Sequence, residues 1–473
     1  MSGSRKKSWQ RGLAAGTAGL LTVAGLLLAG SSANANGPAQ RAAASSSCTS
    51  PTLGAARIGH IGGLARPTST HACSPSGAGQ PAQGTPPLIF HGGPVMGTPS
   101  TANKVVITPI YWGPAGHTFT SSYKTLLTRY FKDSAAASDT TSNIWSTMFQ
   151  YSGSNGKINY RFTVGTPIND TNAFPANGCT VSPGPVYADN TGYNACLDDA
   201  QLQAEASSVV AAHGLPRDFG HIYVLYLPKK VESCVNAGSS TVNNQCTINS
   251  SPTAAYCAYH SMTAGGLVYA NMPFPIYSSA TGFSCTDEGL GGGIQAPNGD
   301  KDADVEISPA SHEVAEAITD PDVSGGWYDS SGFENGDECA YTYGPLGGAA
   351  GAHFNQTING HVYLTQEEFS NRDFNATGGG CLQREAQPAP SLTKVTPASG
   401  THLGGTSVVV TGTNFAGATA VTFGGTPATS FTVNTNGRIT AISPAHAVGT
   451  VDVRVTTSTG TTVIKVADHY TYN

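Results

Sequence analysis

Apolar residues near the start of the main domain form two different patterns, one typical of a buried strand and one typical of an amphipathic helix. A continuous apolar run at 104–112 (KVVITPIYW) predicts a buried strand. An amphipathic helix is predicted over 119–133, because apolar residues recur there at spacings of three and four. These residues are Tyr123, Leu126, Leu127, Tyr130 and Phe131.

The same kinds of pattern continue to residue 274. A short helix at 143–151, a strand at 158–164, a long helix at 197–214 and a strand at 221–227 are predicted, followed by an antiparallel pair at 254–261 and 266–274. This order predicts an α/β domain at 88–385 with a mixed sheet and helices, compatible with a zincin-like arrangement. We expect the preceding Ala/Ser/Gly/Pro-rich segment, 36–87, to be flexible.

One more helix is predicted at 309–319. Ser308 is a suitable N-cap, Pro309 suits the first helical position, and Pro321 ends the pattern. His312 and Glu316 are separated by one helical turn and share a face.

The C-terminal pattern is different. After a Pro-containing linker at 387–392, short Val/Thr-rich segments separated by glycine turns predict a β-sandwich at 391–473. The sequences VTPASG, GGTSVVVTGTNF, VTFGGTPA and the closing YTY resemble the IPT/TIG domain family. This resemblance implies an immunoglobulin-like module and no chemistry of its own.

The N-terminus indicates secretion. A basic cluster, an apolar run at about 12–30 and the small residues Ala33-Asn34-Ala35 predict a signal peptide at 1–35. No later apolar run approaches the ~20 residues that a membrane-spanning helix needs.

Ten cysteines suit an oxidising compartment, and all of them follow the predicted cleavage site. Spacing alone does not determine their pairing. We expect neighbours to pair, as Cys48–Cys73, Cys179–Cys196, Cys234–Cys246, Cys257–Cys285 and Cys339–Cys381.

Negative charge is concentrated in one short segment of a chain that has few charged residues. Only 11% of the residues are charged and the pI is near 6.1, so no general basic field exists to attract nucleic acid. Twelve of the 29 acidic residues lie between 300 and 338: Asp300, Asp302, Asp304, Glu306, Glu313, Glu316, Asp320, Asp322, Asp329, Glu334, Asp337 and Glu338. A bound cation would relieve their mutual repulsion.

The sequence SHEVAEAITDPD at 311–322 resembles the zinc-protease signature HExxH, with Glu316 in place of the second histidine. A zinc hydrolase needs three protein ligands, an open position for water and a carboxylate base. His312 and Glu316 are candidate ligands, and Glu313 is the candidate base that would act on a metal-activated water. The candidates for the third ligand are Asp322, Glu334 and Asp337, with His260, His353 and His361 also available.

Zinc is the favoured metal, although other ions and other chemistry remain open. The alternating acids of DKDADVE at 300–306 suggest calcium, but the segment lacks the glycine and the distal glutamate of an EF-hand. A solvated acidic helix with no function is the structural alternative. A further alternative is a glycoside hydrolase that uses two carboxylates of the acidic segment, although no spacing in the sequence selects one pair.

Four stretches resemble the phosphate-induced protein 1 (EXORDIUM-like) family. They are HGGPVM at 91–96, CAYHS at 257–261, APNGDKDADVEI at 296–307 and AITDPDVSGGWYD at 317–329. The resemblance implies an extracellular or cell-wall-associated protein and no settled activity. It also accounts for the TDP sequence without requiring catalysis.

Two hypotheses follow. The first is a secreted, zincin-like metallohydrolase, most plausibly a peptidase. The second is a non-catalytic extracellular binding protein with a structural cation and a docking IPT/TIG module. The expected partners are an extracellular protein, a peptide or a cell-wall glycan.

Overall fold

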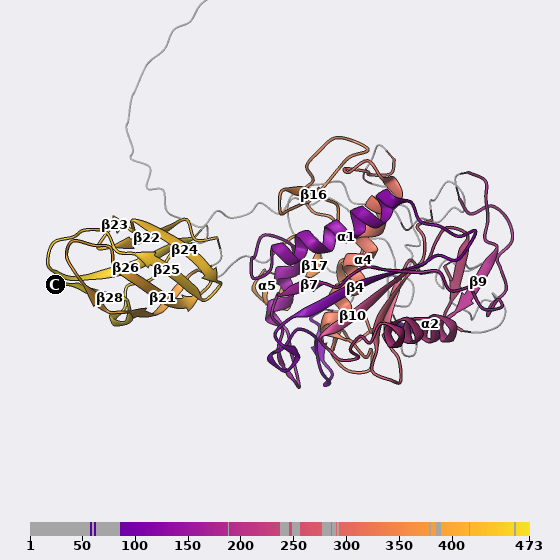
Figure 1. Cartoon of the computed structure of the whole chain (residues 1–473), viewed down its shortest axis with the longest axis horizontal. Helices are drawn as coiled ribbons and strands as arrows, with labels where there is room; N and C mark the ends of the chain where they lie inside the picture. The colour runs from indigo at the N-terminus through magenta and orange to yellow at the C-terminus, as the bar shows by residue number, and fades with distance from the viewer. Residues whose placement is uncertain are drawn as a thin grey trace, which may run out of the picture. The chain divides into compact units, whose positions relative to one another are not determined.

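The computed structural model describes residues 57–58, 61–62, 86–187, 189–236, 246–247, 256–276, 285, 290, 293–377, 380–384, 389–415, 417–457 and 460–473. The predicted signal peptide and the expected Cys48–Cys73 pair lie outside this set. Figure 1 shows an α/β domain and a separate all-β domain at the C-terminus.

The α/β domain is built on an eight-stranded mixed sheet, as the sequence predicts. The strand order is β1-β2-β12-β13-β10-β4-β7, and β8 also pairs with β4. The bounds are β1 Arg57–Ile58, β2 Ile61–Gly62, β4 Val105–Trp112, β7 Phe162–Val164, β8 Ile168–Asp170, β10 His221–Tyr226, β12 Tyr259–Met262 and β13 Val268–Met272. Strands β13, β10, β4, β7 and β8 run parallel, whereas β12 is antiparallel to β13. The predicted antiparallel pair is therefore confirmed.

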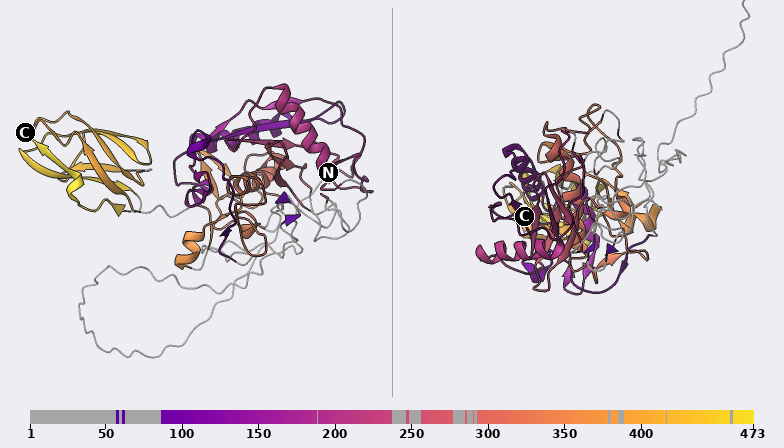
Figure 2. Two further views of the ribbon diagram at one scale, coloured as in Figure 1. Left: turned by 90° about the horizontal axis from the view of Figure 1, so that it is seen from below. Right: turned by 90° about the vertical axis from the view of Figure 1, so that its right-hand side faces the viewer.

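Alternate residues of the central strands enter two different cores. In β10, Ile222 and Val224 belong to one core, whereas Tyr223 and Leu225 belong to the other. Helices α1 (Ser121–Ala136) and α4 (Lys301–Thr319) contribute to the first core, and α2 (Asp199–Ala212) contributes to the second. Figure 2 shows α2 and α4 on opposite sides of the sheet.

Two predicted helices are confirmed with small shifts in their ends. Thr120 caps α1, because its side chain accepts a hydrogen bond from the Tyr123 N–H. Asp198 and Gln201 form a reciprocal capping box at the start of α2. The segment predicted as a short helix at 143–151 is a 3₁₀-helix over Ile144–Gln150.

The predicted start of α4 is wrong. The helix begins at Lys301, and the Asp300 side chain caps it by accepting a hydrogen bond from the Ala303 N–H. Pro309 therefore lies inside the helix, where it removes one backbone donor. Ser308 does not cap: its hydroxyl accepts a hydrogen bond from the Gln366 N–H.

The calcium loop considered for 300–306 is also contradicted, because 301–306 form the first turns of this helix. Asp304 accepts hydrogen bonds from the backbone and side chain of Asn298. The acids of this segment thus cap and anchor a helix end, where negative charge is stabilised by the helix dipole.

Shorter elements complete the domain. Five two-stranded ladders pair β3 Ile89–Phe90 with β14 Trp327–Tyr328, β5 Ser152–Gly153 with β6 Gly156–Lys157, β9 Ala195–Asp198 with β11 Val231–Cys234, β15 Gln356–Ile358 with β16 His361–Tyr363, and β17 Glu368–Phe369 with β18 Cys381–Leu382. Helix α5 covers Asn371–Thr377. Among the described residues, no helix combines the length and apolar character needed to span a membrane.

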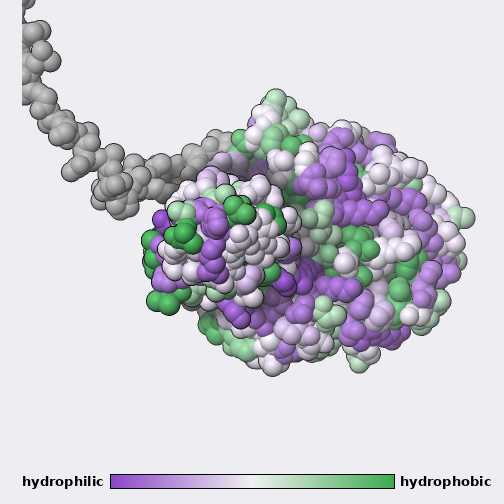
Figure 3. Space-filling view, turned by 60° about the vertical axis from the view of Figure 1, so that its left-hand side comes forward, coloured by the Kyte–Doolittle hydropathy of each residue, from purple (hydrophilic) through white to green (hydrophobic). Residues whose placement is uncertain are grey.

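The C-terminal domain has two facing sheets and its own core. One sheet has the order β19-β21-β25-β24, with bounds Ser391–Thr396, Ser407–Thr413, Arg438–Ile442 and Ser430–Thr435. The other has the order β20-β28-β26-β22-β23, with β27 beside β26; the bounds are Ser399–Gly400, His469–Tyr472, Gly449–Thr457, Ala420–Phe423, Thr426–Pro427 and, for β27, Gly460–Thr461. Val410, Phe423 and Tyr470 are among the residues buried between them. Among the described residues of this domain, the exposed large apolar side chains are Leu403, Val448, Val463, Ile464 and Val466. Figure 3 shows hydrophobic residues at the surface of this domain.

Candidate metal centre

Helix α4 carries its acidic residues on the inside of the molecule. It packs across β10, β12 and β13, and His312, Glu313 and Glu316 are all fully buried. The solvated acidic helix considered from sequence is therefore wrong for this segment. Burial of ionised carboxylates is costly without a compensating positive charge.

One group of side chains contains three of the predicted ligands. His312 Nε2 lies 2.8 Å from Glu316 Oε1 and 3.6 Å from Asp337 Oδ1. The backbone N–H of Asp337 also donates to Glu316 Oε1, at 2.9 Å, which holds the two elements together. All three side chains are fully buried.

The chemistry and spacing of this group suit a zinc-class ion. One imidazole and two carboxylates form a mixed N/O donor set, and one donor atom from each lies within 4.8 Å of the others. Tetrahedral zinc with ligands at 2.0–2.2 Å separates its donors by roughly 3.3 Å. His312 Nε2 makes no hydrogen bond within the described part of the chain, despite its short distance to Glu316.

Gln366 controls which nitrogen of His312 carries the proton. Its amide nitrogen faces His312 Nδ1 and also donates to Gly336 O at 2.8 Å. In this orientation Nδ1 accepts and Nε2 carries the proton. Metal binding at Nε2 therefore requires the amide to turn, so that its oxygen accepts from Nδ1–H.

A second group surrounds His260, from strand β12. His260 Nδ1 lies 3.3 Å from Glu313 Oε2 and 3.6 Å from Glu316 Oε2, and Nε2 lies 3.0 Å from Asp320 O. Glu334 Oε1 is 3.8 Å from Nε2. Both ring nitrogens thus face acceptors, as in an imidazolium.

The two histidines have opposite electrostatic environments. Burial alone would lower the pKa of His260, but the charges of Glu334, Glu313 and Asp320 raise it to about 9. Burial lowers the pKa of His312 to about 4, although Glu313 acts against this shift. His260 therefore neutralises part of the negative charge as a buried cation, whereas His312 is neutral at pH 7.

The predicted site residues thus fall into separate places. His312, Glu316 and Asp337 come together, and Glu313 and Glu334 lie beside His260. Asp322 is elsewhere: its carboxylate accepts from the N–H groups of Ser324 and Gly325 in the turn after α4.

The other two histidines considered are also elsewhere. His353 Nδ1 lies 3.2 Å from Gly347 O, and His361 Nδ1 lies 2.7 Å from Asp133 Oδ2.

Sequence reasoning missed the residues that support the site. Gln366 follows β16, and Asn335 bridges Thr319 of α4 to Glu368 of β17. Burial and, after it, the charge of Glu316 raise the pKa of Glu368 above its ordinary value. No spacing within the sequence marks these three residues as neighbours of α4.

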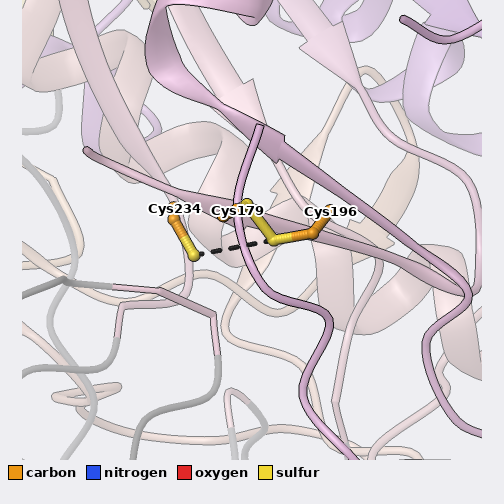
Figure 4. Close-up of side chains that lie close together, drawn as sticks. All are labelled: Cys179, Cys196 and Cys234. Carbon is orange, nitrogen blue, oxygen red and sulfur yellow. Dashed lines mark hydrogen bonds between the residues drawn. A yellow bond between two sulfur atoms is a disulfide. The ribbon is translucent and has the colours of Figure 1, made fainter. Parts of the chain in front are cut away.

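A cysteine cluster beside β9 and β11 is not a metal site. Four of the expected disulfides are confirmed: Cys179–Cys196, Cys234–Cys246, Cys257–Cys285 and Cys339–Cys381. Figure 4 shows Cys234 Sγ next to the Cys179–Cys196 bridge, 3.7 Å from Cys196 Sγ. Both of these sulfurs are in disulfides, so neither is a thiolate that could ligate a metal.

Comparison with known proteins identifies part of the chain only. None of the curated proteins compared with the chain matches it. Similar solved structures include the plexin A4 extracellular region, with 19% identity over 24% of this chain and 9% of that chain and a TM-score of 0.16. SGBP-B from a complex xyloglucan utilization locus in Bacteroides uniformis has 24% identity over 23% of this chain and 28% of its own, with a TM-score of 0.17.

The gamma-CGTase from alkalophilic Bacillus clarkii has 19% identity over 26% of this chain and 17% of its own, with a TM-score of 0.16. This chain therefore spans well under two thirds of the length of these proteins. The family model of the IPT/TIG domain matches residues 390–472. The C-terminal β-sandwich is therefore an IPT/TIG domain.

Proposed function

We propose that this protein is a secreted, zincin-like metallohydrolase that acts on peptides. The observation that carries the proposal is the convergence of His312, Glu316 and Asp337 on one buried point, with Glu313 next to His312 on α4. His312, Glu316 and Asp337 would hold a divalent metal, zinc by donor type. When bound, such an ion lowers the pKa of a coordinated water and polarises a carbonyl.

The residues of the chain have distinct roles in this proposal. Glu313 would accept a proton as general base, and His260 fixes its orientation through the 3.3 Å contact. Gln366 orients the His312 ring.

The edge of strand β12 supports a peptide as substrate. Strand β2 pairs there in antiparallel orientation, with Gly62 in register with His260. An extended backbone can therefore hydrogen-bond beside the residue that contacts Glu313. A peptide substrate would take this position in place of β2.

A second function is favoured by the complete burial of the centre. In this alternative the protein is a non-catalytic EXORDIUM-like extracellular binding protein, and the cation is structural. A closed site with no exposed ligand is typical of structural metals. Both functions share the secreted location, which the signal-peptide pattern and the four disulfides support.

The variant Glu313→Gln separates the two functions. On a casein-type substrate, we expect it to lower hydrolysis by at least ~100-fold while metal content is unchanged, because only the base is lost. A matched control is Glu367→Gln: burial raises the pKa of Glu367 to about 8, so a neutral amide is a close substitute at pH 7. Equal hydrolysis by Glu313→Gln and the unmodified protein would exclude Glu313 as the base, and absence of hydrolysis in the zinc-loaded protein would favour the structural role.

A further inference from the structure

The IPT/TIG domain contains a separate cluster of metal-ligand side chains. Asp452 of β26 lies directly opposite His469 of β28 in the antiparallel register, and His469 Nε2 is 3.5 Å from Asp452 Oδ1. Asp468 precedes His469 and ends the 3₁₀-helix η6 (Val466–Asp468). One ligand atom from each of the three residues lies within 4.8 Å of the others.

Asp468 is the feature that distinguishes this cluster from an ordinary acidic surface. Its side chain is only 1% exposed, and Oδ2 accepts a hydrogen bond from the Lys465 N–H at 2.8 Å. Oδ1 is equally buried and has no hydrogen-bond donor among the described residues. A buried carboxylate oxygen without a donor is costly beside a second carboxylate, unless a cation or a proton compensates it.

The nearby basic side chains point to other partners. Lys465 Nζ donates to Ser391 Oγ at 3.3 Å, although the Lys465 backbone contacts Asp468. Arg454, on the same strand as Asp452, donates through Nε and Nη2 to Thr462 O. The Lys465 ammonium and the Arg454 guanidinium thus donate these hydrogen bonds to Ser391 and Thr462, and not to Asp452 or Asp468.

We propose that Asp452, Asp468 and His469 form a second divalent metal site on the IPT/TIG domain. One imidazole and two carboxylates favour a zinc-class transition ion over calcium, which binds oxygen ligands. The side chains of Asp452 and His469 are 32% and 45% exposed, so solvent reaches the site. Three protein ligands leave at least one position for water or for a ligand from a partner surface.

Zinc titration of the metal-free full-length protein tests the proposal, with stoichiometry read by calorimetry. We expect Asp468→Asn and His469→Gln each to remove one zinc equivalent or to weaken it by at least ~10-fold. The matched control is Asp218→Asn: Asp218 lies 2.7 Å from His221 on the surface, outside the metal-ligand groups found among the described residues. This control should leave the titration unchanged.

The same assay separates this site from the centre on α4. The variant His312→Ala should remove a different zinc equivalent and leave the one that depends on Asp468. Zinc binding that is identical in Asp468→Asn, His469→Gln and the unmodified protein would overturn the proposal and indicate that a proton neutralises the Asp452–Asp468 pair. Asp452→Asn is a third ligand variant and should weaken the same zinc equivalent; its side chain is partly exposed, so misfolding is a smaller concern.

Discussion

At the residue scale, the protonation of His312 determines whether the centre can bind metal. The sequence identifies His312, Glu313 and Glu316, because helical spacing places ligands on one face. The sequence cannot show whether Asp337 or Asp322 is the third ligand, because that depends on how the chain after Pro321 folds back onto α4. Nor can it identify Gln366, which lies 54 positions from His312.

Gln366→Glu is expected to preserve or increase zinc affinity, because a carboxylate accepts from Nδ1–H and leaves Nε2 for the metal. Gln366→Ala should weaken zinc binding by about 10–100-fold, the usual effect of losing such a partner. Competition with a zinc indicator at pH 7 measures both variants. Equal affinity in Gln366→Glu, Gln366→Ala and the unmodified protein would contradict the proposed role of His312.

Glu367 provides a prediction on pH and stability. Its folded pKa of about 8 lies above the ordinary value of 4.5, so the folded state holds this proton more tightly than the unfolded state. Its stabilising contribution is complete below about pH 4.5 and is lost as pH rises through 8. Relative to the unmodified protein, Glu367→Gln should therefore gain about 4 kcal/mol between pH 5 and 9, because three pH units separate pH 5 from the folded pKa at ~1.4 kcal/mol per unit. Urea unfolding of both proteins at pH 5 and at pH 9 is the measurement. The same difference in unfolding free energy between the two proteins at both pH values would disprove this prediction.

At the scale of elements, the sequence pattern gives the sheet and the helices but places the start of α4 wrongly. Pro309 in the sequence predicts a first helical position, whereas the helix already begins at Lys301. Tertiary packing explains the difference, because Ala303, Ile307 and Ala310 are all buried in the core. Burial of this face compensates for the backbone hydrogen bond that Pro309 removes.

The corrected helix start can be tested with its cap. Asp300→Ala should lower the stability of the α/β domain by about 1 kcal/mol, because the Ala303 N–H loses its acceptor. Asp300→Asn keeps a capping oxygen and should cost much less. Thermal unfolding of both variants is the measurement, and equal melting temperatures for Asp300→Ala and the unmodified protein would argue against this N-cap.

At the scale of the whole molecule, the two domains have separate hydrophobic cores. The main-domain clusters and the IPT/TIG cluster share no residue. The IPT/TIG domain could be identified from sequence, because its strands and turns form a continuous motif. The main domain could be assigned only to the α/β class, because its resemblance to the EXORDIUM-like family is carried by short, scattered stretches.

Removal of residues 389–473 should therefore leave zinc binding at α4 intact. We expect the truncated protein to lose only the zinc equivalent that depends on Asp468, and its remaining equivalent to be removed by Asp337→Asn. Metal analysis after gel filtration measures both effects. Loss of all zinc from a folded truncated protein would contradict the assignment of a metal to each domain.

The proposed function depends on a metal held by His312, Glu316 and Asp337. Crystallography of the zinc-loaded protein, with anomalous scattering measured on both sides of the zinc absorption edge, tests it most directly. We expect an anomalous peak about 2.0–2.2 Å from His312 Nε2 and from a carboxylate oxygen of both Glu316 and Asp337. A zinc-loaded crystal with no peak at this point, and with His312 Nε2 still 2.8 Å from Glu316 Oε1, would contradict it.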